Sequence, residues 1–81
     1  MYEGLLWFDD DPSRDLAEKV DRAAKRYKQK FGAAPDVCYV HPAALEQEQP
    51  VTIDDVRVAP LVSVLKHHFW VGEEEVHHSR R

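Results

Sequence analysis

The feature that most constrains the fold of this chain is an apolar stripe with the spacing of an α-helix. The stripe consists of Leu16, Val20, Ala23, Ala24, Tyr27 and Phe31. Its later members lie four, seven, eight, eleven and fifteen residues after the first, which is the repeat of one helix face. Asp11 as N-cap with Pro12 behind it favours a helix start, and Gly32 favours an end. We therefore predict one long helix whose apolar face packs on a sheet or another helix.

Two β-rich segments flank the predicted helix. Residues 2–8 precede it, and residues 37–41 follow it between Pro35 and Pro42. A strand, a helix and a strand at this spacing predict a right-handed β-α-β unit with two parallel strands. Both strands would then end at the same edge of the sheet, which is where open α/β sheets bind ligands.

The C-terminal half of the chain contains shorter extended segments. Residues 51–53 and 56–58 predict either a hairpin around Asp54 and Asp55 or one strand with a bulge there. Residues 69–71 predict a last strand closed by Gly72. Residues 60–66 fit either a helix opened by Pro60 or an extended path. Their valines favour the extended path, because β-branched side chains suit extended backbone.

These elements predict the α+β fold class. We expect a β-α-β unit extended by one or two further strands, with a single long helix packed on a mixed sheet of three or four strands. At 81 residues the chain is long enough for one small domain with one modest core. We expect this domain to span residues 1–72 and residues 73–81 to form an exposed polar tail.

Charge and cysteine content narrow the partners and the compartment. A formal net charge of -4 argues against a dedicated nucleic-acid binder, whose affinity comes mostly from neutralised phosphates. The basic residues between positions 19 and 30 match the negative end of the helix dipole, with a phosphate-binding face as the alternative. The apolar run before Asp9 is too short for a signal peptide or a membrane span. Cys38 is the only cysteine, which fits a reducing compartment, so we expect a cytoplasmic protein without membrane contact.

An acidic segment follows the first predicted strand. Asp9 and Asp10 would share the sheet edge with His41, which ends the second predicted strand. Carboxylates and an imidazole are suitable ligands for Mg²⁺, Mn²⁺ or Zn²⁺, and such a metal could activate water for phosphoester hydrolysis. The alternative is structural, because aspartates at a helix start also cap the helix and complement its dipole. A metal-dependent phosphoesterase or nuclease is therefore the second functional hypothesis.

Other candidate groups predict little chemistry. His67 and His68 would point to opposite faces of a strand and could chelate one ion only from a loop. His77 and His78 fall in the predicted tail. Cys38 lies within a predicted strand and indicates a buried, inert thiol. The chain has no glycine-rich phosphate loop and no paired-cysteine motif, so we expect no nucleotide cofactor.

The leading functional hypothesis comes from the aromatic content. One helix covers only one face of a sheet, and alternation along the strands sends some large side chains to the other face. The chain supplies Tyr2, Trp7, Tyr39, Phe69 and Trp70. An exposed apolar face on a small protein marks an interface. We therefore expect a small binding or accessory protein that acts through protein contacts of its sheet face, with itself as a partner in a homo-oligomer.

Two resemblances accompany these arguments. Residues 31–42 (FGAAPDVCYVHP) and 68–72 (HFWVG) resemble segments of small prokaryotic proteins of unassigned function, over about half of the chain. The opening strand that ends in Asp9 before a helix resembles the ferredoxin-like nucleases of CRISPR systems. The second resemblance implies a nuclease, although this chain lacks a clear second helix and a strong basic surface.

Overall fold

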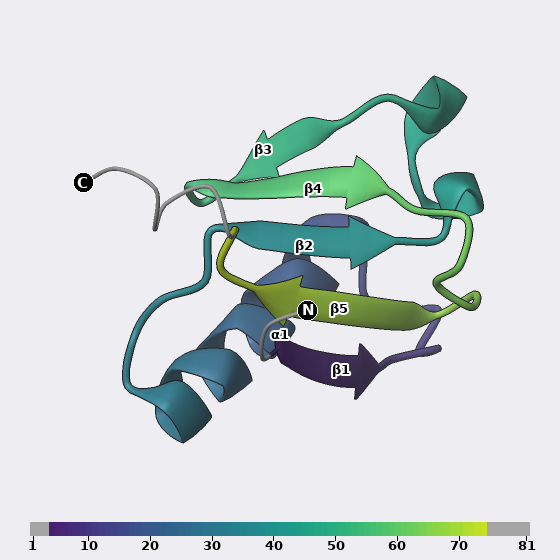
Figure 1. Cartoon of the computed structure of the whole chain (residues 1–81). Helices are drawn as coiled ribbons and strands as arrows, with labels where there is room; N and C mark the ends of the chain where they lie inside the picture. Colours follow the sequence, from purple (N-terminus) through teal and green to yellow (C-terminus); the bar gives the residue numbers. More distant parts are fainter. Residues whose placement is uncertain (1–3, 75–81) are drawn as a thin grey trace.

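Five strands form one mixed sheet, and a single helix covers one face of it (Figure 1). The computed structural model of the chain describes residues 4–74. The elements are β1 (Gly4–Phe8), α1 (Leu16–Phe31), β2 (Val37–Val40), β3 (Val51–Ile53), β4 (Val56–Pro60) and β5 (His68–Gly72). The α+β class with one long helix is confirmed, and the sheet has more strands than the three or four expected.

The strand order is β1-β5-β2-β4-β3. Strands β1 and β2 are both antiparallel to β5, so they run in the same direction, as the predicted β-α-β unit requires. The prediction that they lie side by side is wrong, because β5 lies between them (Figure 1). Phe69 and Val71 of β5 are buried, which suits a central strand. The carboxyl ends of β1 and β2 still emerge at the same edge of the sheet.

Helix α1 begins four residues later than the sequence predicts. Its N-cap is Asp15, whose carboxylate accepts a hydrogen bond from the Glu18 backbone N–H at 2.9 Å. Asp11 instead closes a turn, because its carboxylate accepts hydrogen bonds from both the backbone N–H and the hydroxyl of Ser13. The predicted end is confirmed: Gly32 adopts a left-handed conformation with φ of 79°.

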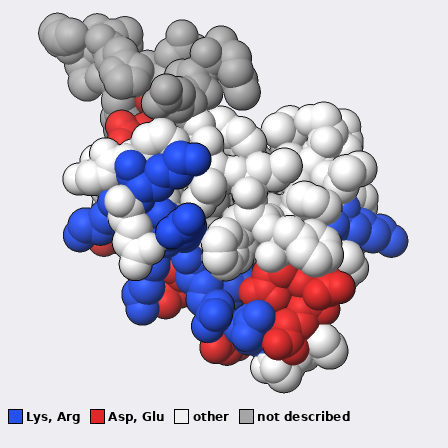
Figure 2. All heavy atoms as spheres, turned by 90° about the horizontal axis from the view of Figure 1, so that it is seen from below, with Lys and Arg blue, Asp and Glu red and all other residues white. Residues whose placement is uncertain are grey.

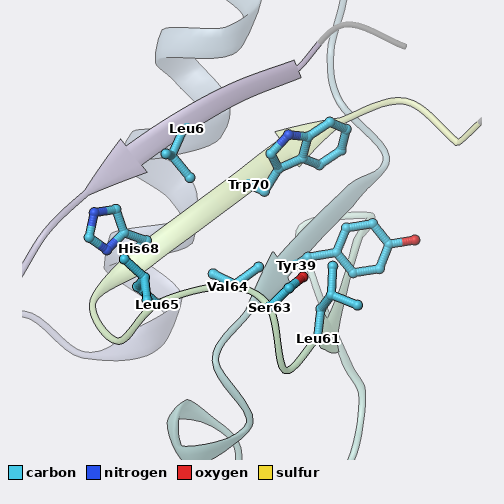
Figure 3. Close-up of a pocket in the computed structure, with 8 residues that line it drawn as sticks. All are labelled: Leu6, Tyr39, Leu61, Ser63, Val64, Leu65, His68 and Trp70. Atoms are coloured by element: carbon cyan, nitrogen blue, oxygen red, sulfur yellow. The ribbon is translucent and has the colours of Figure 1, made fainter. Parts of the chain in front are cut away.

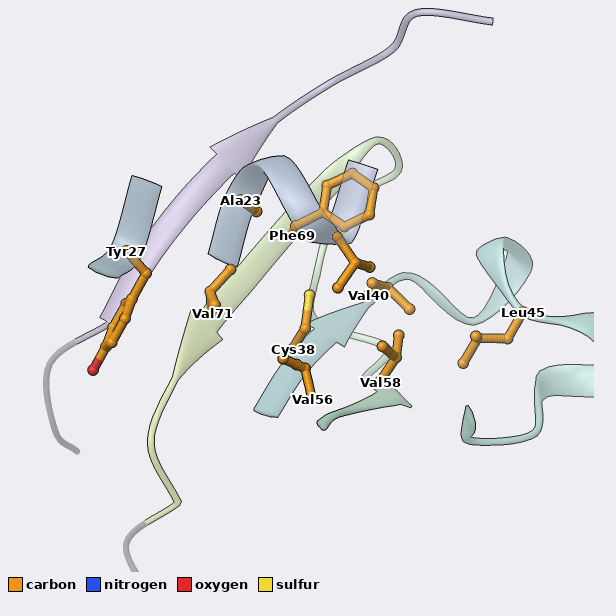
Figure 4. Packing of buried hydrophobic residues seen from close by; sticks show 10 residues of the cluster. Ala23, Tyr27, Cys38, Val40, Leu45, Val56, Val58, Phe69 and Val71 are labelled. Carbon is orange, nitrogen blue, oxygen red and sulfur yellow. The ribbon is translucent and has the colours of Figure 1, made fainter. Parts of the chain in front are cut away.

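The core lies between α1 and the sheet (Figure 4). The helix buries Val20, Ala23 and Tyr27 and packs the rest of its stripe at the margin, as predicted. The sheet and the loop after β2 contribute Cys38, Val40, Leu45, Val56, Val58, Phe69 and Val71. Each buried valine, leucine or phenylalanine stabilises the fold by ~1.5–3 kcal/mol, so this single layer of contacts holds the domain together.

Of the two alternatives for residues 51–58, the structure has the hairpin, formed by β3 and β4. Its two turn residues, Asp54 and Asp55, both have positive φ, which is the geometry of a type I′ turn between twisted strands. The chain enters β3 through two short 3-10 turns, Pro42–Ala44 and Glu46–Glu48.

The segment between β4 and β5 is neither of the two alternatives. It forms successive turns, in which Leu61 O accepts from Val64 N at 3.0 Å and Leu65 O accepts from His68 N at 3.1 Å. Strand β4 is parallel to β2 and β5 is antiparallel to β2, so the chain must reverse direction between β4 and β5. The two tight turns make this reversal within a short connection.

The ends of the chain differ in part from the prediction. Glu73 and Glu74 were predicted to open an exposed tail, but both are half-buried. The Glu74 backbone N–H donates to the Asp36 carboxylate at 2.9 Å, and the Glu74 carboxylate pairs with Arg57. The rest of the predicted tail, with His77 and His78, and the predicted strand residue Tyr2 lie outside the described residues. Within residues 4–74, no helix has the length and apolarity that a membrane span needs.

Candidate functional site

The edge where β1 and β2 end holds the first candidate site. Asp9 is only 5% exposed there, and its carboxylate is held by Arg14 through hydrogen bonds from Nε at 2.9 Å and Nη2 at 3.2 Å. The Asp11 backbone N–H donates to the same carboxylate at 3.0 Å. These donors favour the charged form, and the hydrogen bond from Arg14 is the main reason that the pKa of Asp9 lies below its usual value. Asp9 is thus a neutralised, structural carboxylate in this arrangement.

The other two aspartates of the acidic segment point to different environments. Asp11 is engaged by Ser13, whose backbone and hydroxyl hydrogen bonds lower the pKa of the Asp11 carboxyl. Asp11 also lies 3.3 Å from Arg14 Nη1. Asp10 is exposed to solvent, and no hydrogen bond or ion pair of its side chain is seen among residues 4–74. Asp9 and Asp11 therefore meet at the guanidinium of Arg14, whereas Asp10 lies apart from them in solvent.

His41 lies at the same edge of the sheet, close to His67 and His68. Its Nδ1 accepts a hydrogen bond from the Ala43 backbone N–H at 3.0 Å, which places the proton of a neutral ring on Nε2. His41 shares a hollow of about 250 Å³ with Lys19, His67 and His68. The backbone connects this hollow to Asp9, because the Asp9 N–H donates to the carbonyl of His67 at 2.9 Å. The sequence therefore predicted the edge correctly for Asp9 and His41, but missed Arg14, Lys19 and the role of His67.

The positions of Asp9, Asp10 and His41 can be compared with what a metal site needs. In the part of the chain that the structure describes, no group of three His, Cys, Asp or Glu side chains is placed to hold a metal ion. The carboxylate of Asp9 is occupied by Arg14, so a metal would have to displace that guanidinium. The Mg²⁺, Mn²⁺ or Zn²⁺ site at these residues stays a prediction for a binding experiment.

The second candidate site is the face of the sheet that α1 does not cover, which we call the open face. Alternation along the strands places Leu6 and Phe8 of β1, Trp70 of β5 and Tyr39 of β2 on this face. Leu6 is 61% exposed and Phe8 is 55% exposed. The loop between β4 and β5 lies beside this face and carries Leu65, 69% exposed, and Val62, 85% exposed. Large apolar side chains are costly to leave in water. The open face is such an apolar surface, and no helix among residues 4–74 covers it.

The open face is hollowed under the loop after β4 (Figure 3). The hollow has a volume of about 540 Å³ and is lined by Leu6, Tyr39, Leu61, Ser63, Val64, Leu65, His68 and Trp70. Figure 3 shows that these side chains come from three neighbouring strands and the loop. None of them is an aspartate, glutamate, lysine or arginine, so the hollow offers apolar contact with a few hydroxyl and imidazole groups at its margin.

Part of this surface could be read from the sequence. The aromatic residues of the strands predicted an apolar second face, and Trp70 and Tyr39 lie on it with ring centroids 5.9 Å apart. The contribution of Leu61, Val62 and Leu65 was missed, because an extended path was preferred for their segment. Their signal was an apolar run in a segment that has neither helical nor strand periodicity.

Cys38 lies on the opposite side of the sheet, within the core. Burial raises the pKa of its thiol to about 12, because the apolar surroundings disfavour the charged thiolate. The predicted inert thiol agrees with this environment.

The chain was compared with known proteins at the level of families, sequences and structures. No protein-family model, no curated protein and no solved structure matches it.

Proposed function

We propose that this chain is a small binding protein that works by self-association, with the open face of one copy packed against the open face of another. The observation that supports the proposal is the apolar surface formed by Leu6, Phe8, Val62 and Leu65, all more than half exposed. Leu6 and Leu65 line a hollow on the face of the sheet that no described helix covers, whereas Phe8 and Val62 are not part of its lining. A surface of this composition favours a permanent protein contact over a charged substrate or a nucleic acid.

A second copy of the chain suits this surface for two reasons. The lining of the hollow carries no aspartate, glutamate, lysine or arginine, so two identical faces meet without repulsion between such charges. The same face also presents a projection beside the hollow, because Val62 lies between the lining residues Leu61 and Ser63 and is almost fully exposed. A projection and a hollow on one surface allow the mutual insertion that a two-fold interface requires.

The energetic scale is adequate for a stable pair. Full burial of one exposed leucine, valine or phenylalanine is worth ~1.5–3 kcal/mol. A two-fold contact buries Leu6, Phe8, Val62 and Leu65 from both copies. This gain is comparable with the ~4–15 kcal/mol that association costs in lost freedom of motion. The lone buried thiol of Cys38 needs no oxidising environment, which fits action in the cytoplasm.

Sedimentation and light scattering across a concentration series test the proposal. We expect the full chain to form a dimer or a larger assembly, and Val62→Asp and Leu65→Asp to shift it to a lower mass, because each puts a charge into an apolar contact. Val51→Asp is the matched control, since Val51 is also partly exposed but belongs to the edge strand β3, away from the hollow. A parent chain that stays monomeric at every concentration would contradict self-association.

A further inference from the structure

A second surface, the outer edge of β1, carries an inference that goes beyond the open face. Strand β1 is the end strand of the sheet and pairs with β5 alone among the described elements. The Asp9 N–H donates to the carbonyl of His67 in the register of this pair, so Asp9 points its peptide groups toward β5. Alternation then turns those of Trp7 and Leu5 toward β5, and those of Phe8, Leu6 and Gly4 outward. Within residues 4–74, strand β1 therefore has a row of peptide groups at its outer edge that no other strand pairs with.

This edge lacks the usual protection against strand pairing. Natural edge strands are guarded by lysine, proline, a bulge or extreme shortness. Residues 4–8, Gly-Leu-Leu-Trp-Phe, contain no charged residue and no proline, and they pair with β5 in an unbroken register. The opposite edge is different, because β3 has only three residues and is protected by its shortness. The edge of β1 is thus the longer and the less protected of the two.

The helix beside this edge has its charges divided by sign. Trp7 of β1 and the adjoining side of α1 line a shallow hollow of about 430 Å³. The helix residues in that lining are Glu18, Asp21, Arg22, Lys25, Arg26 and Gln29. The acidic members lie toward the start of the helix and the basic members toward its end. Figure 2 views the molecule from the β1 side and shows most Lys and Arg gathered to one side and the largest acidic cluster to the other, with smaller acidic patches among the basic side chains.

Most of the basic side chains at this edge are available for contact. Lys25 pairs with Asp21 at 3.1 Å, but no ion pair of Arg22 or Arg26 is found within residues 4–74. Both arginines are exposed. A surface with one acidic half and one basic half is complementary to a copy of itself turned through 180°.

We propose that two copies of the chain join through antiparallel pairing of β1 with β1 of a second copy, which makes one continuous ten-stranded sheet. The two-fold axis passes beside Leu6, so that Leu6 faces Leu6 of the partner subunit and Gly4 faces Phe8 of the partner subunit. The outward peptide groups of these residues form the hydrogen bonds. The two α1 helices then run antiparallel on the same side of the sheet, and the acidic half of each lies beside the basic half of the other.

The spacing of the layers is compatible with this contact. Neighbouring strands lie about 4.8 Å apart, so the two copies of β5 are separated by roughly 14 Å. Helix α1 packs on β5 and β1, which brings the facing sides of the two helices within reach of long arginine and glutamate side chains. Parallel pairing would instead place like charges together, so the charge pattern selects the antiparallel arrangement.

The edge contact and the open-face contact use different surfaces. Edge pairing leaves both open faces on the same side of the joined sheet, where they remain free for the face-to-face contact. If both contacts form, they supply the two kinds of two-fold axis of a D₂ tetramer. The edge is therefore tested in a chain that carries Val62→Asp, so that the outcome does not depend on the open face.

In that background, Leu6→Pro removes an outward N–H and no hydrogen bond of the β1–β5 pair, because the peptide groups of Leu6 face away from β5. We expect the Val62→Asp chain to be a dimer, Leu6→Pro to make it monomeric, and the matched variant Leu6→Thr, which keeps the N–H, to leave it dimeric. Sedimentation gives the masses and circular dichroism checks the fold. A monomeric Val62→Asp chain, or a folded Leu6→Pro chain that stays dimeric, would overturn the edge proposal. The proposed open-face contact is judged separately, from the difference between the parent and Val62→Asp.

A charge exchange tests the same contact without touching β1. One chain carries Arg22→Glu and Arg26→Glu, and another carries Glu18→Lys and Asp21→Lys, both in the Val62→Asp background. We expect each chain alone to self-associate at least about tenfold more weakly than the Val62→Asp chain, since like charges then face each other. An equimolar mixture should form mixed dimers at low salt, and added salt should weaken them. Mixed dimers no more stable than the separate chains would count against the proposed helix alignment.

Discussion

The indole ring of Trp70 occupies the space in which a side chain at Gly4 would stand. A Cβ atom built on Gly4 would overlap the six-membered ring of Trp70, so β1 can pass beneath the indole only with glycine at this position. Trp70 lies directly opposite Leu6 in the β1–β5 pair and leans along the strand toward Gly4. This contact joins the edge strand to the open face, because the same indole lines the hollow there.

The first prediction concerns this contact. Gly4→Ala should lower the free energy of unfolding by ~1–3 kcal/mol, since the indole must move or the strand must shift. It should also change the tryptophan fluorescence of the folded protein and weaken association through the open face. Chemical denaturation, emission spectra and sedimentation measure the three effects.

Gly32→Ala is the matched control for Gly4→Ala. No atom lies within 4 Å of a Cβ built on Gly32, but its φ of 79° is left-handed. Its cost of ~1–2 kcal/mol should therefore come from the backbone alone, with unchanged fluorescence and association. A Gly4→Ala protein with parental stability and emission would show that the indole does not hold this position in solution.

Local patterns explain which elements the sequence predicts well. The stripe of α1 repeats within sixteen residues, and the hairpin turn at Asp54 and Asp55 is a two-residue signal, so both are visible without tertiary context. The position of β5 between β1 and β2 is not visible in this way. It depends on Phe69 and Val71 packing under α1 from the far end of the chain, and no local pattern encodes that order.

In the candidate site, too, some features can be predicted from the sequence and others depend on the folded structure. Asp9 and His41 were placed at one sheet edge because parallel strands end together, and this relation survives the insertion of β5. The partner of Asp9 was not predicted, because the turn through Asp11 and Ser13 decides where Arg14 points. Asp11 and Asp15 both have the side chain of an N-cap, and only the turn geometry determines which of them caps α1.

The second prediction concerns stability in acid. The pKa of Asp9 is lower in the folded chain than its ordinary value of 3.8, chiefly because Arg14 donates to the carboxylate. The unfolded chain therefore binds the proton first as the pH falls, and the stabilisation is complete above the unfolded pKa and lost as the pH drops through the folded one. Asp9→Asn should flatten the fall in unfolding free energy below about pH 4. Urea denaturation at several pH values measures this slope, with the exposed neighbour variant Asp10→Asn as control. An unaltered slope in Asp9→Asn would contradict the charged pair.

The third prediction concerns the proposed metal ligands. If Asp9, Asp10 and His41 bind Mn²⁺ or Zn²⁺, Asp9→Asn and His41→Ala must each weaken binding. Arg14→Ala should strengthen it, because this change frees the Asp9 carboxylate from its guanidinium partner. Isothermal titration measures the affinities, and a phosphodiester assay with each metal measures activity. Equal affinity in the parent and all three variants, without hydrolysis, would remove the phosphoesterase hypothesis.

The fourth prediction concerns the thiol of Cys38. The side chain is fully buried in the core, and its pKa is raised to about 12, so very little reactive thiolate exists at neutral pH. A thiol reagent should therefore label the folded protein only as fast as the core opens, and label the protein in denaturant at once. The labelling rate should rise in Val71→Ala, because a smaller neighbour in the same cluster lowers the free energy of opening by ~0.5–3 kcal/mol. The exposed-site variant Val62→Asp is the control, since Val62 lies outside that cluster. Rapid labelling of the folded parent chain would mean that α1 does not seal this side of the sheet.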